Sequence, residues 1–175
     1  FDNTLGAIYI VRDPRNIVTS LSKFKSLTLE ESADFMIKGT GDGLVWTNNW
    51  AVNYHSWKIF KEYEKYLLIK YEDLIANPDL TFLNVLKFIY KINKSNFELD
   101  KKKFENVIKT TSFENMQNLE KEKGFSESWV DEKTGKKIPF FYLGPKNNWK
   151  KNLDVKVVKK LEKAFKLEME ELGYL

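Results

Sequence analysis

Two short apolar runs constrain the fold of this chain more than any other feature. Ala7 to Val11 (AIYIV) and Tyr66 to Tyr71 (YLLIKY) are almost continuously apolar. Runs of this length are typical of strands that a parallel sheet buries on both faces. Helical patterns lie between the two runs and after them. We therefore predict an α/β fold in which a parallel sheet is flanked by helices in three layers.

Helix-start signals support this pattern. Asp13 offers a side-chain acceptor at an N-cap, and Pro14 lacks the N–H that the first turn of a helix leaves unused. Thr28 and Glu31 have the spacing of a capping box. Asn77-Pro78 opens another helix. Periodicity predicts further helices over about 47–63, 101–109, 112–122 and 154–172, with loops over 124–137 and 140–149.

The length of 175 residues suits one domain, which we expect to span residues 1–175. Only two strands are clear in the sequence, and two strands make a poor sheet. The first residue is Phe rather than Met, and the first strand follows within a few residues. We therefore expect further strands upstream of residue 1, in a domain truncated at its N-terminus.

Composition excludes several classes of function. The net charge of +4 is mild, and lysines are interspersed with acids, which favours an anionic small molecule or a solubilising surface over nucleic acid. The chain has no Cys and one His, so disulfides, thiolate metal sites and a histidine-rich metal site are excluded. No apolar run reaches the roughly 18 residues of a membrane span, and no signal pattern opens the chain. These features predict a cytoplasmic protein.

Arg12 follows the first apolar run, at the point where a helix begins. In parallel α/β sheets ligands collect at the carboxyl ends of the strands, and a helix start attracts anions. Arg12 could grip a phosphate with its planar donors, and Ser20 could donate from two turns into the helix. In the alternative interpretation, Arg12 pairs with Asp13, Glu72 or Asp73, and Ser20 is merely solvated. Spacing alone slightly favours this alternative, because arginines are common at the ends of strands.

Two later segments add candidate contacts. Tyr71 ends the second apolar run, at a position equivalent to that of Arg12 after the first run, and can stack on a base. Its alternative role is a half-buried core aromatic. Thr111 to Met116 (TSFENM) supplies hydroxyls, an aromatic ring and a thioether at a helix start. Alternatively, Thr111 and Glu114 form a capping box, and the apolar members of the segment are core residues.

Four segments, taken in order, carry a resemblance to a known family. They are YIVRDPRNIVTS, NNWAVNYHSW, LLIKYEDLIANP, and TSFENM followed by FFYLGPKNNWKKNL, and together they span almost the whole chain. In this order they resemble the nucleotide-dependent sulfotransferases. That family moves a sulfuryl group from 3′-phosphoadenylyl sulfate (PAPS) to an acceptor hydroxyl or amine.

The resemblance implies a P-loop nucleotide-transferase-like fold and assigns residues to a cofactor site that needs no metal. Arg12 and Ser20 match the arginine and serine that contact the 3′-phosphate. The matches to residues around the adenine are Tyr71, Thr111, Ser112, Phe113 and Met116. Gly144 and Trp149 match the glycine and tryptophan of the family's R-K-G-x-x-G-D-W-K loop.

The chain departs from the family pattern in this loop. Tyr142-Leu143 stand where the family usually has Arg-Lys, so two expected phosphate contacts are missing, and Asn147-Asn148 replace Gly-Asp. Nearby lysines that could restore the charge are Lys146, Lys150 and Lys151. The family's phosphosulfate loop and its usual histidine base are expected upstream of residue 1, so no catalytic residue is assigned.

The predicted function is that of a sulfotransferase. This chain is expected to supply the half of the cofactor site that binds the 3′-phosphate and the adenine. One alternative is a non-catalytic or degenerate nucleotide-binding or scaffold module. A second alternative, nucleic-acid binding through the lysines, is disfavoured by the mild and interspersed charge. The expected acceptor is a small molecule, a glycan or a lipid, with residues 38–45 and 124–137 as candidate pocket loops. The sequence indicates no oligomeric state.

Overall fold

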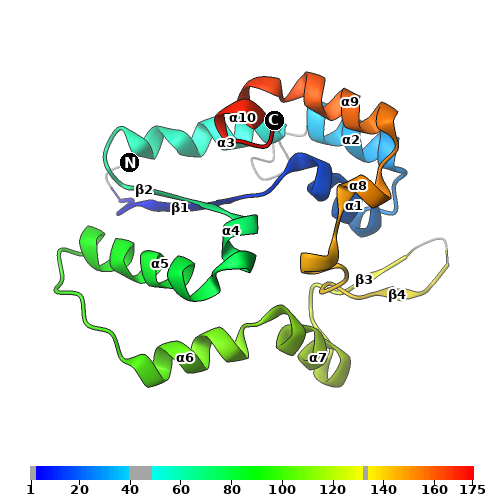
Figure 1. Cartoon of the computed structure of the whole chain (residues 1–175). Helices are drawn as coiled ribbons and strands as arrows, with labels where there is room; N and C mark the ends of the chain where they lie inside the picture. Colours follow the sequence, from blue (N-terminus) through cyan, green and yellow to red (C-terminus); the bar gives the residue numbers. More distant parts are fainter. Residues whose placement is uncertain (1–2, 40–48, 132–133) are drawn as a thin grey trace. The chain divides into compact units, whose positions relative to one another are not determined.

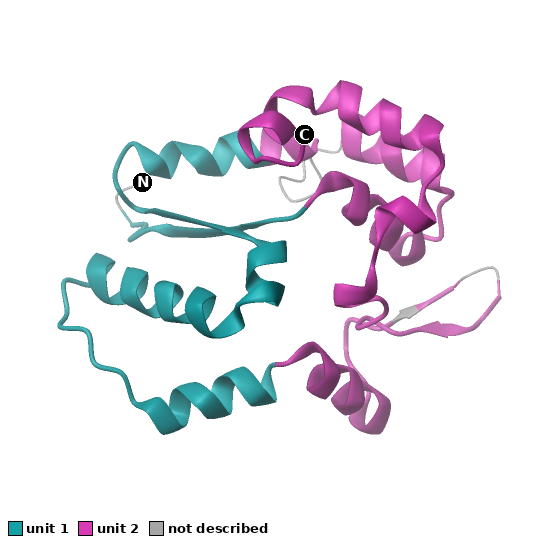
Figure 2. Cartoon of the chain, in the orientation of Figure 1, with its two compact units in different colours: residues 1–12, 54–111 teal, residues 13–53, 112–175 magenta. Residues whose placement is uncertain are grey.

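The computed structural model describes residues 3–39, 49–131 and 134–175 (Figure 1). The chain forms two compact units (Figure 2). Unit 1 comprises residues 1–12 and 54–111, and unit 2 comprises residues 13–53 and 112–175. Most of the elements are helices, and they accompany a small parallel sheet. The predicted α/β class is therefore confirmed.

The parallel sheet of unit 1 consists of the two predicted strands. Strand β1 (Ala7–Val11) pairs with β2 (Tyr66–Lys70), and the register runs from Ala7 opposite Tyr66 to Val11 opposite Lys70. Parallel pairing requires a long crossover, which the intervening helices supply. Because the pairing is parallel, both strands end at the same edge of the sheet, immediately before Arg12 and Tyr71.

Helices lie on both faces of this sheet. Figure 1 shows α5 on one side of the strands and α3 on the other. On the α3 side, the ring of Tyr54 lies 6.0 Å from that of Tyr9. On the α5 side, a Cβ added at Gly6 would lie 3.3 Å from the Phe88 ring and 3.0 Å from the Lys65 carbonyl oxygen. The bounds of the helices are α3 Trp50–Lys58, which begins in unit 2, η2 Ile59–Lys61, α4 Tyr71–Ala76, α5 Pro78–Ile92 and α6 Lys101–Thr110.

Unit 2 is built almost entirely from helices. Its first helix is capped by Asp13, whose side chain accepts the Arg15 backbone N–H, and has Pro14 in its first turn. Thr28 and Glu31 form the predicted capping box of the second helix. The elements of unit 2 are α1 Pro14–Phe24, α2 Leu29–Lys38, α7 Phe113–Lys123, β3 Trp129–Val130, β4 Lys137–Ile138, η3 Gly144–Lys146, α8 Trp149–Asn152, α9 Val155–Ala164 and α10 Lys166–Glu171.

The structure corrects several of the predicted segments. The loop predicted over 140–149 contains the short helix η3 and the start of α8. Residues 124–137 are not only loop, because β3 and β4 form a short antiparallel hairpin with Trp129 opposite Ile138. Each strand has only two residues, which is too short for an alternating pattern to be visible in the sequence. The helix predicted over 154–172 is two helices, α9 and α10, which meet at Phe165 with φ −117° and ψ 25°. The predicted helix over 47–63 is described from residue 49 onward; residues 47 and 48 lie outside the described residues.

The core of unit 2 forms where α1, α2, α9 and α10 pack together. Val18, Ala33, Leu161, Phe165 and Met169 are all 0% exposed. They come from each of these four helices and from Phe165, at the break between α9 and α10. Side chains at i and i+4 lie on one face of a helix. This explains how Leu161, Phe165 and Met169 enter the same core in spite of the break.

We predict that this core dominates the stability of unit 2. Leu161→Ala should lower the free energy of unfolding by about 2–5 kcal/mol, because it leaves a cavity in a fully buried site. Leu167→Ala is the matched control, since Leu167 is 76% exposed on the neighbouring helix. It should change stability by less than about 0.5 kcal/mol. Equal effects of the two variants in urea denaturation would contradict the assigned core.

Candidate nucleotide site

In unit 1, Arg12 and Tyr71 lie together at the carboxyl ends of the two strands. They follow the paired residues Val11 and Lys70. The Arg12 guanidinium carbon lies 4.1 Å from the centre of the Tyr71 ring. A guanidinium stacked on a ring by cation–π attraction still directs its N–H groups outward in its own plane. The pair therefore presents hydrogen-bond donors where ligands of parallel α/β sheets bind.

The environment keeps the Tyr71 phenol neutral. Burial is the main influence and raises the pKa of Tyr71; the Arg12 charge lowers this pKa and the Glu72 charge raises it. The net shift is upward, so the phenol, which is protonated at neutral pH even at its ordinary pKa, stays protonated to a higher pH and can donate a hydrogen bond.

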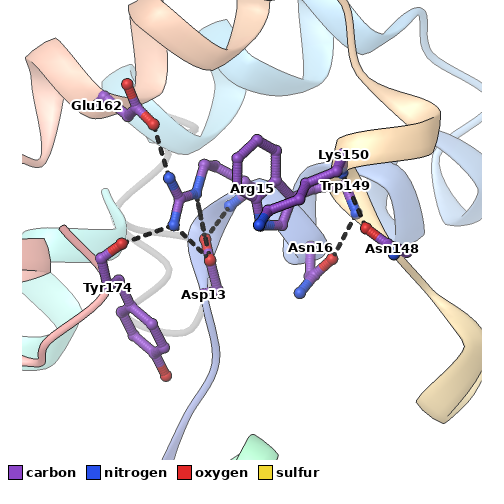
Figure 3. A network of polar contacts seen from close by, with 8 residues as sticks. All are labelled: Asp13, Arg15, Asn16, Asn148, Trp149, Lys150, Glu162 and Tyr174. Atoms are coloured by element: carbon purple, nitrogen blue, oxygen red, sulfur yellow. Dashed lines mark hydrogen bonds and ion pairs between the residues drawn. The ribbon is translucent and has the colours of Figure 1, made fainter.

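In unit 2, the guanidinium of Arg15 is the centre of a polar network (Figure 3). Its Nη2 atom donates to Asp13 Oδ2 at 2.8 Å and to the Tyr174 carbonyl oxygen at 2.8 Å. Its Nη1 atom donates to Glu162 Oε1 at 2.6 Å. The Trp149 ring stacks against it, with the guanidinium carbon 4.1 Å from the ring centre. Arg15 therefore joins the start of α1 to α8, α9 and the residues after α10.

The loop before α8 is attached to α1 at two points. The Trp149 backbone N–H donates to Asn16 Oδ1 at 2.9 Å. The Asn147 amide nitrogen donates to the Asn16 carbonyl at 2.7 Å, to Thr19 Oγ1 at 2.6 Å and to Ser20 Oγ at 3.4 Å. Asn147 is 6% exposed, so these bonds are largely shielded from water. They hold the loop beside the exposed hydroxyl of Ser20.

Gly144 and Phe113, both predicted to contact the cofactor, lie against each other in unit 2. A Cβ added at Gly144 would fall 2.2 to 2.5 Å from three atoms of the Phe113 ring. Gly144 also has φ +47°, a conformation that L side chains rarely adopt. Only glycine suits this position. The Phe113 ring also contacts Phe141, with centres 6.1 Å apart, and Met116 on the same helix is half-buried.

The predicted TSFENM segment spans the boundary between two helices. Thr111 caps the C-terminus of α6, and its hydroxyl donates to the Val107 carbonyl at 2.7 Å. Ser112 is the N-cap of α7, where its Oγ accepts the Asn115 N–H at 3.3 Å. The alternative capping box between Thr111 and Glu114 is therefore wrong, because α7 begins one residue later than that interpretation requires.

Two side chains of α7 hold the backbone that leads to Gly144. Gln117 Nε2 donates to the carbonyls of Phe141 at 2.7 Å and Tyr142 at 3.3 Å. Glu120 accepts the N–H groups of Phe140 at 2.7 Å and Phe141 at 2.9 Å. The half-buried Gln117 and the buried Glu120 thus satisfy backbone groups that would otherwise lack partners.

Of the predicted residues, the structure brings Arg12 next to Tyr71 within unit 1 and Phe113 next to Gly144 within unit 2. Thr111 belongs to unit 1, and Ser20, Ser112 and Met116 belong to unit 2. Sequence reasoning did not single out the polar residues that support these positions. They are Arg15, Gln117, Glu120 and Asn147. The sequence had indicated Asn147 only as a departure from the family pattern. Their partners are mostly far away in the sequence, so no local spacing indicated them.

Three further observations concern other classes of site. Across residues 3–39, 49–131 and 134–175, no group of three or more His, Cys, Asp or Glu side chains could hold a metal ion. In the same part of the chain, no helix is both long and apolar enough to cross a bilayer. His55 lies on α3 with its ring 5.3 Å from that of Tyr54. Of the candidate pocket loop 38–45, residues 40–45 lie outside the described residues.

The sulfotransferase domain family matches residues 1–173, so the chain belongs to this family. The resemblance identified from the four segments is thereby confirmed. Among curated relatives, Sulfotransferase 2A2 of Rattus norvegicus is 25% identical over an alignment of 177 positions, which covers 97% of this chain and 58% of the relative. Cytosolic sulfotransferase 16 of Arabidopsis thaliana is 27% identical and is matched over 96% of this chain and 52% of its own length. The chain thus spans little more than half the length of these relatives.

Solved structures share the fold. A mouse sulfotransferase, SULT7A1, complexed with PAP, superposes with a TM-score of 0.67 at 19% identity, over 94% of this chain and 58% of the mouse chain. Retinol dehydratase in complex with androsterone and the inactive cofactor PAP gives a TM-score of 0.62 at 16% identity, over 94% and 47% of the two chains.

We predict that Glu120 makes stability depend on pH. Burial raises the pKa of Glu120, but hydrogen bonds from Ser128 and from the backbone of Phe140 and Phe141, with the Lys137 charge, lower it more, so the net shift is downward. A carboxylate with a depressed folded-state pKa stabilises the fold above its unfolded pKa, and this contribution disappears as the pH falls through the folded value.

Glu120→Gln should therefore lower the melting temperature at pH 7 and reduce the loss of stability between about pH 5 and pH 3. Glu122→Gln is the control, because Glu122 is an exposed residue of the same helix. Thermal unfolding across this pH range provides the measurement. Parallel stability curves for Glu120→Gln and the unmodified protein would contradict the prediction.

Proposed function

We propose that this chain belongs to a PAPS-dependent sulfotransferase and carries residues that bind the 3′-phosphate and the adenine of the nucleotide. In this proposal residues 1–175 are part of one domain of the P-loop nucleotide-transferase type, with a three-layer arrangement around a parallel sheet, in a cytoplasmic protein. The observation that carries the proposal is the position of Arg12 stacked on Tyr71 at the ends of β1 and β2, in a chain of the sulfotransferase family.

Each assigned residue has chemistry suited to its role. The Arg12 guanidinium supplies a planar set of donors for a phosphate, and Tyr71 holds that plane by stacking. The Ser20 hydroxyl supplies a further donor. Phe113 offers an aromatic surface to a base, and Gly144 allows backbone to approach closely. The remaining adenine contacts of the proposal are Thr111, Ser112 and Met116.

The proposed reaction is in-line transfer of a sulfuryl group. The acceptor oxygen or nitrogen forms a bond to sulfur, the bond from sulfur to the bridging phosphate oxygen breaks, and the acceptor proton passes to a base. Catalysis of this kind depends on positioning and on stabilising charge that develops on the leaving oxygen. The residues of this chain contribute by binding and orienting the nucleotide. We assign no general base within the chain, His55 included.

The acceptor in this proposal is a small molecule with a hydroxyl or amine group. Two curated relatives are named for hydroxysteroids, among them the 3-beta-hydroxysteroid sulfotransferase of Cavia porcellus at 24% identity. The retinol dehydratase structures hold androsterone or retinol. These names make hydroxylated lipids the first acceptors to test, with sugars and lipid head groups next.

The alternative function is a nucleotide-binding or scaffold module without transferase activity. Tyr142-Leu143 favour it, because the Arg-Lys pair of the family loop is replaced by uncharged residues. The transferase requires nucleotide binding, whereas the module binds the nucleotide weakly or acts only as a scaffold. Only the transferase incorporates radiolabelled sulfate from PAPS into an acceptor. Sulfate transfer by the protein would exclude the module.

Arg12→Ala tests the proposed nucleotide site. The variant should raise the dissociation constant of PAP, the desulfated nucleotide, by more than about tenfold, because it removes a charge-assisted contact to phosphate. Isothermal titration calorimetry with PAP is the measurement. Lys87→Ala is the matched control, since it removes one positive charge from an exposed position of α5 in the same unit. It should leave the constant unchanged.

A change of less than twofold in Arg12→Ala would remove the central claim of the proposal. Ser20→Ala extends the test to unit 2, and we expect a smaller loss because a neutral hydroxyl contributes less than a guanidinium. Undetectable binding of PAP by the unmodified protein would overturn the transferase and a nucleotide-binding module, and would leave only the scaffold.

A further inference from the structure

The loop of this chain lacks the arginine that the sulfotransferase family usually places before its lysine and glycine. Tyr142 stands at that position and is 43% exposed. Its backbone is fixed by Gln117, which donates to its carbonyl, and by its own N–H, which donates to the Phe140 carbonyl at 3.0 Å. The Tyr142 side chain therefore projects from a positioned backbone.

A cation occupies the space beside this ring. Lys23 Nζ lies 4.9 Å from the centre of the Tyr142 ring. Lys23 comes from the last turn of α1, whereas Tyr142 is 119 residues later in the chain (142 − 23). Cation–π attraction at an exposed site is worth roughly 0.5–1 kcal/mol, which is enough to bias a flexible lysine toward one arrangement.

The same face of α1 carries Ser20. Residues three apart on a helix are neighbours, so the Lys23 and Ser20 side chains leave α1 on the same side. Both side chains are exposed. Asn147 donates to Ser20 Oγ, which leaves the hydroxyl hydrogen of Ser20 to donate elsewhere. This face therefore offers an O–H donor and an ammonium donor next to the loop.

The charge of Lys23 is not neutralised within the described part of the chain. No Asp or Glu of residues 3–39, 49–131 and 134–175 forms an ion pair with it. Lys160 in the same unit shows the contrast, because it is bound by Glu30 at 2.7 Å and Asp34 at 2.9 Å. The Lys23 ammonium can therefore bind an anion without first breaking an ion pair.

We propose that Lys23, positioned by the Tyr142 ring, supplies the positive charge that the family loop obtains from its arginine, and that it binds the nucleotide 3′-phosphate together with Ser20. The inference rests on the nucleotide-binding function proposed above. Lysine binds phosphate as a point charge, whereas arginine binds it through a fixed fork. The exchange therefore retains charge at the site with looser geometry.

The first test compares two nucleotides by titration calorimetry. Lys23→Gln should weaken the binding of PAP about tenfold. The dissociation constant of adenosine 5′-phosphate, which lacks the 3′-phosphate, should stay within twofold of its value for the unmodified protein. Lys25→Gln is the matched control. Lys25 lies two residues further along, with its Nζ 4.7 Å from the Phe35 ring, so the variant loses the same charge and the same type of aromatic contact at another place.

The second test restores the family residue. Tyr142→Arg in the Lys23→Gln background should recover most of the lost PAP affinity, because it returns a cation to the position where the family has one. The binding of adenosine 5′-phosphate should again be unchanged. This recovery is a readout that a purely structural role of Lys23 would not produce.

Several outcomes would overturn the inference. Binding of PAP by Lys23→Gln within twofold of the unmodified protein, an equal loss for both nucleotides, or no recovery in the double variant would each do so. Lys146→Ala is measured in parallel, since a tenfold loss there with no loss in Lys23→Gln assigns the compensating charge to Lys146. If Arg12→Ala still weakens the binding of PAP, the proposed function stands even when these results overturn the inference about Lys23. Failure of the inference and failure of the proposed function are therefore distinguishable.

Discussion

The position of the first helix in unit 2 depends on one buried guanidinium. Arg15 is 6% exposed and is satisfied by Asp13, Glu162, the Tyr174 carbonyl and the face of Trp149. Burial lowers the pKa of Arg15, but the bonds to Asp13 and Glu162 raise it more, so the charge is retained. A buried ion pair adds little net stability, yet losing one partner leaves an uncompensated charge and is strongly destabilising. This asymmetry ties α1, α8, α9 and the segment after α10 to one arrangement.

The loop that resembles the family's phosphate loop takes its place from this arrangement. Trp149, at its end, stacks on Arg15 and donates through its backbone to Asn16, while Asn147 bonds to three residues of α1. Side chains of α7 hold the loop at its beginning. The loop is therefore bound to the same helix that carries Ser20 and Lys23. Tyr142, which changes the chemistry of the loop, therefore lies beside a fixed face of α1. In the proposed arrangement, a side chain of α1 supplies the charge that the loop itself lacks.

Local signals in the sequence predicted much of the secondary structure. Asp13 and Thr28 cap the helices where their spacing indicated, and both apolar runs are strands in parallel register. Capping and strand formation depend on neighbours within a few residues, so a short window contains the necessary information. The predicted helix over 112–122 is present as α7, and only the alternative capping box was wrong, because Ser112 rather than Thr111 caps this helix. The prediction was also wrong for the β3–β4 hairpin, whose two-residue strands are too short to show an alternating pattern.

The sequence by itself determined the class of fold, the family and the candidate residues from Arg12 to Gly144, because motif order and residue chemistry are properties of the chain. Only the tertiary structure decided which of these residues have partners and what those partners are. The stacking of Arg12 on Tyr71, the clamp of Asn147 on α1 and the meeting of Lys23 with Tyr142 each join residues at least 59 positions apart (71 − 12). The physical reason is that such contacts depend on how buried faces pack. Packing is decided by the whole core, and no local pattern of residues encodes it.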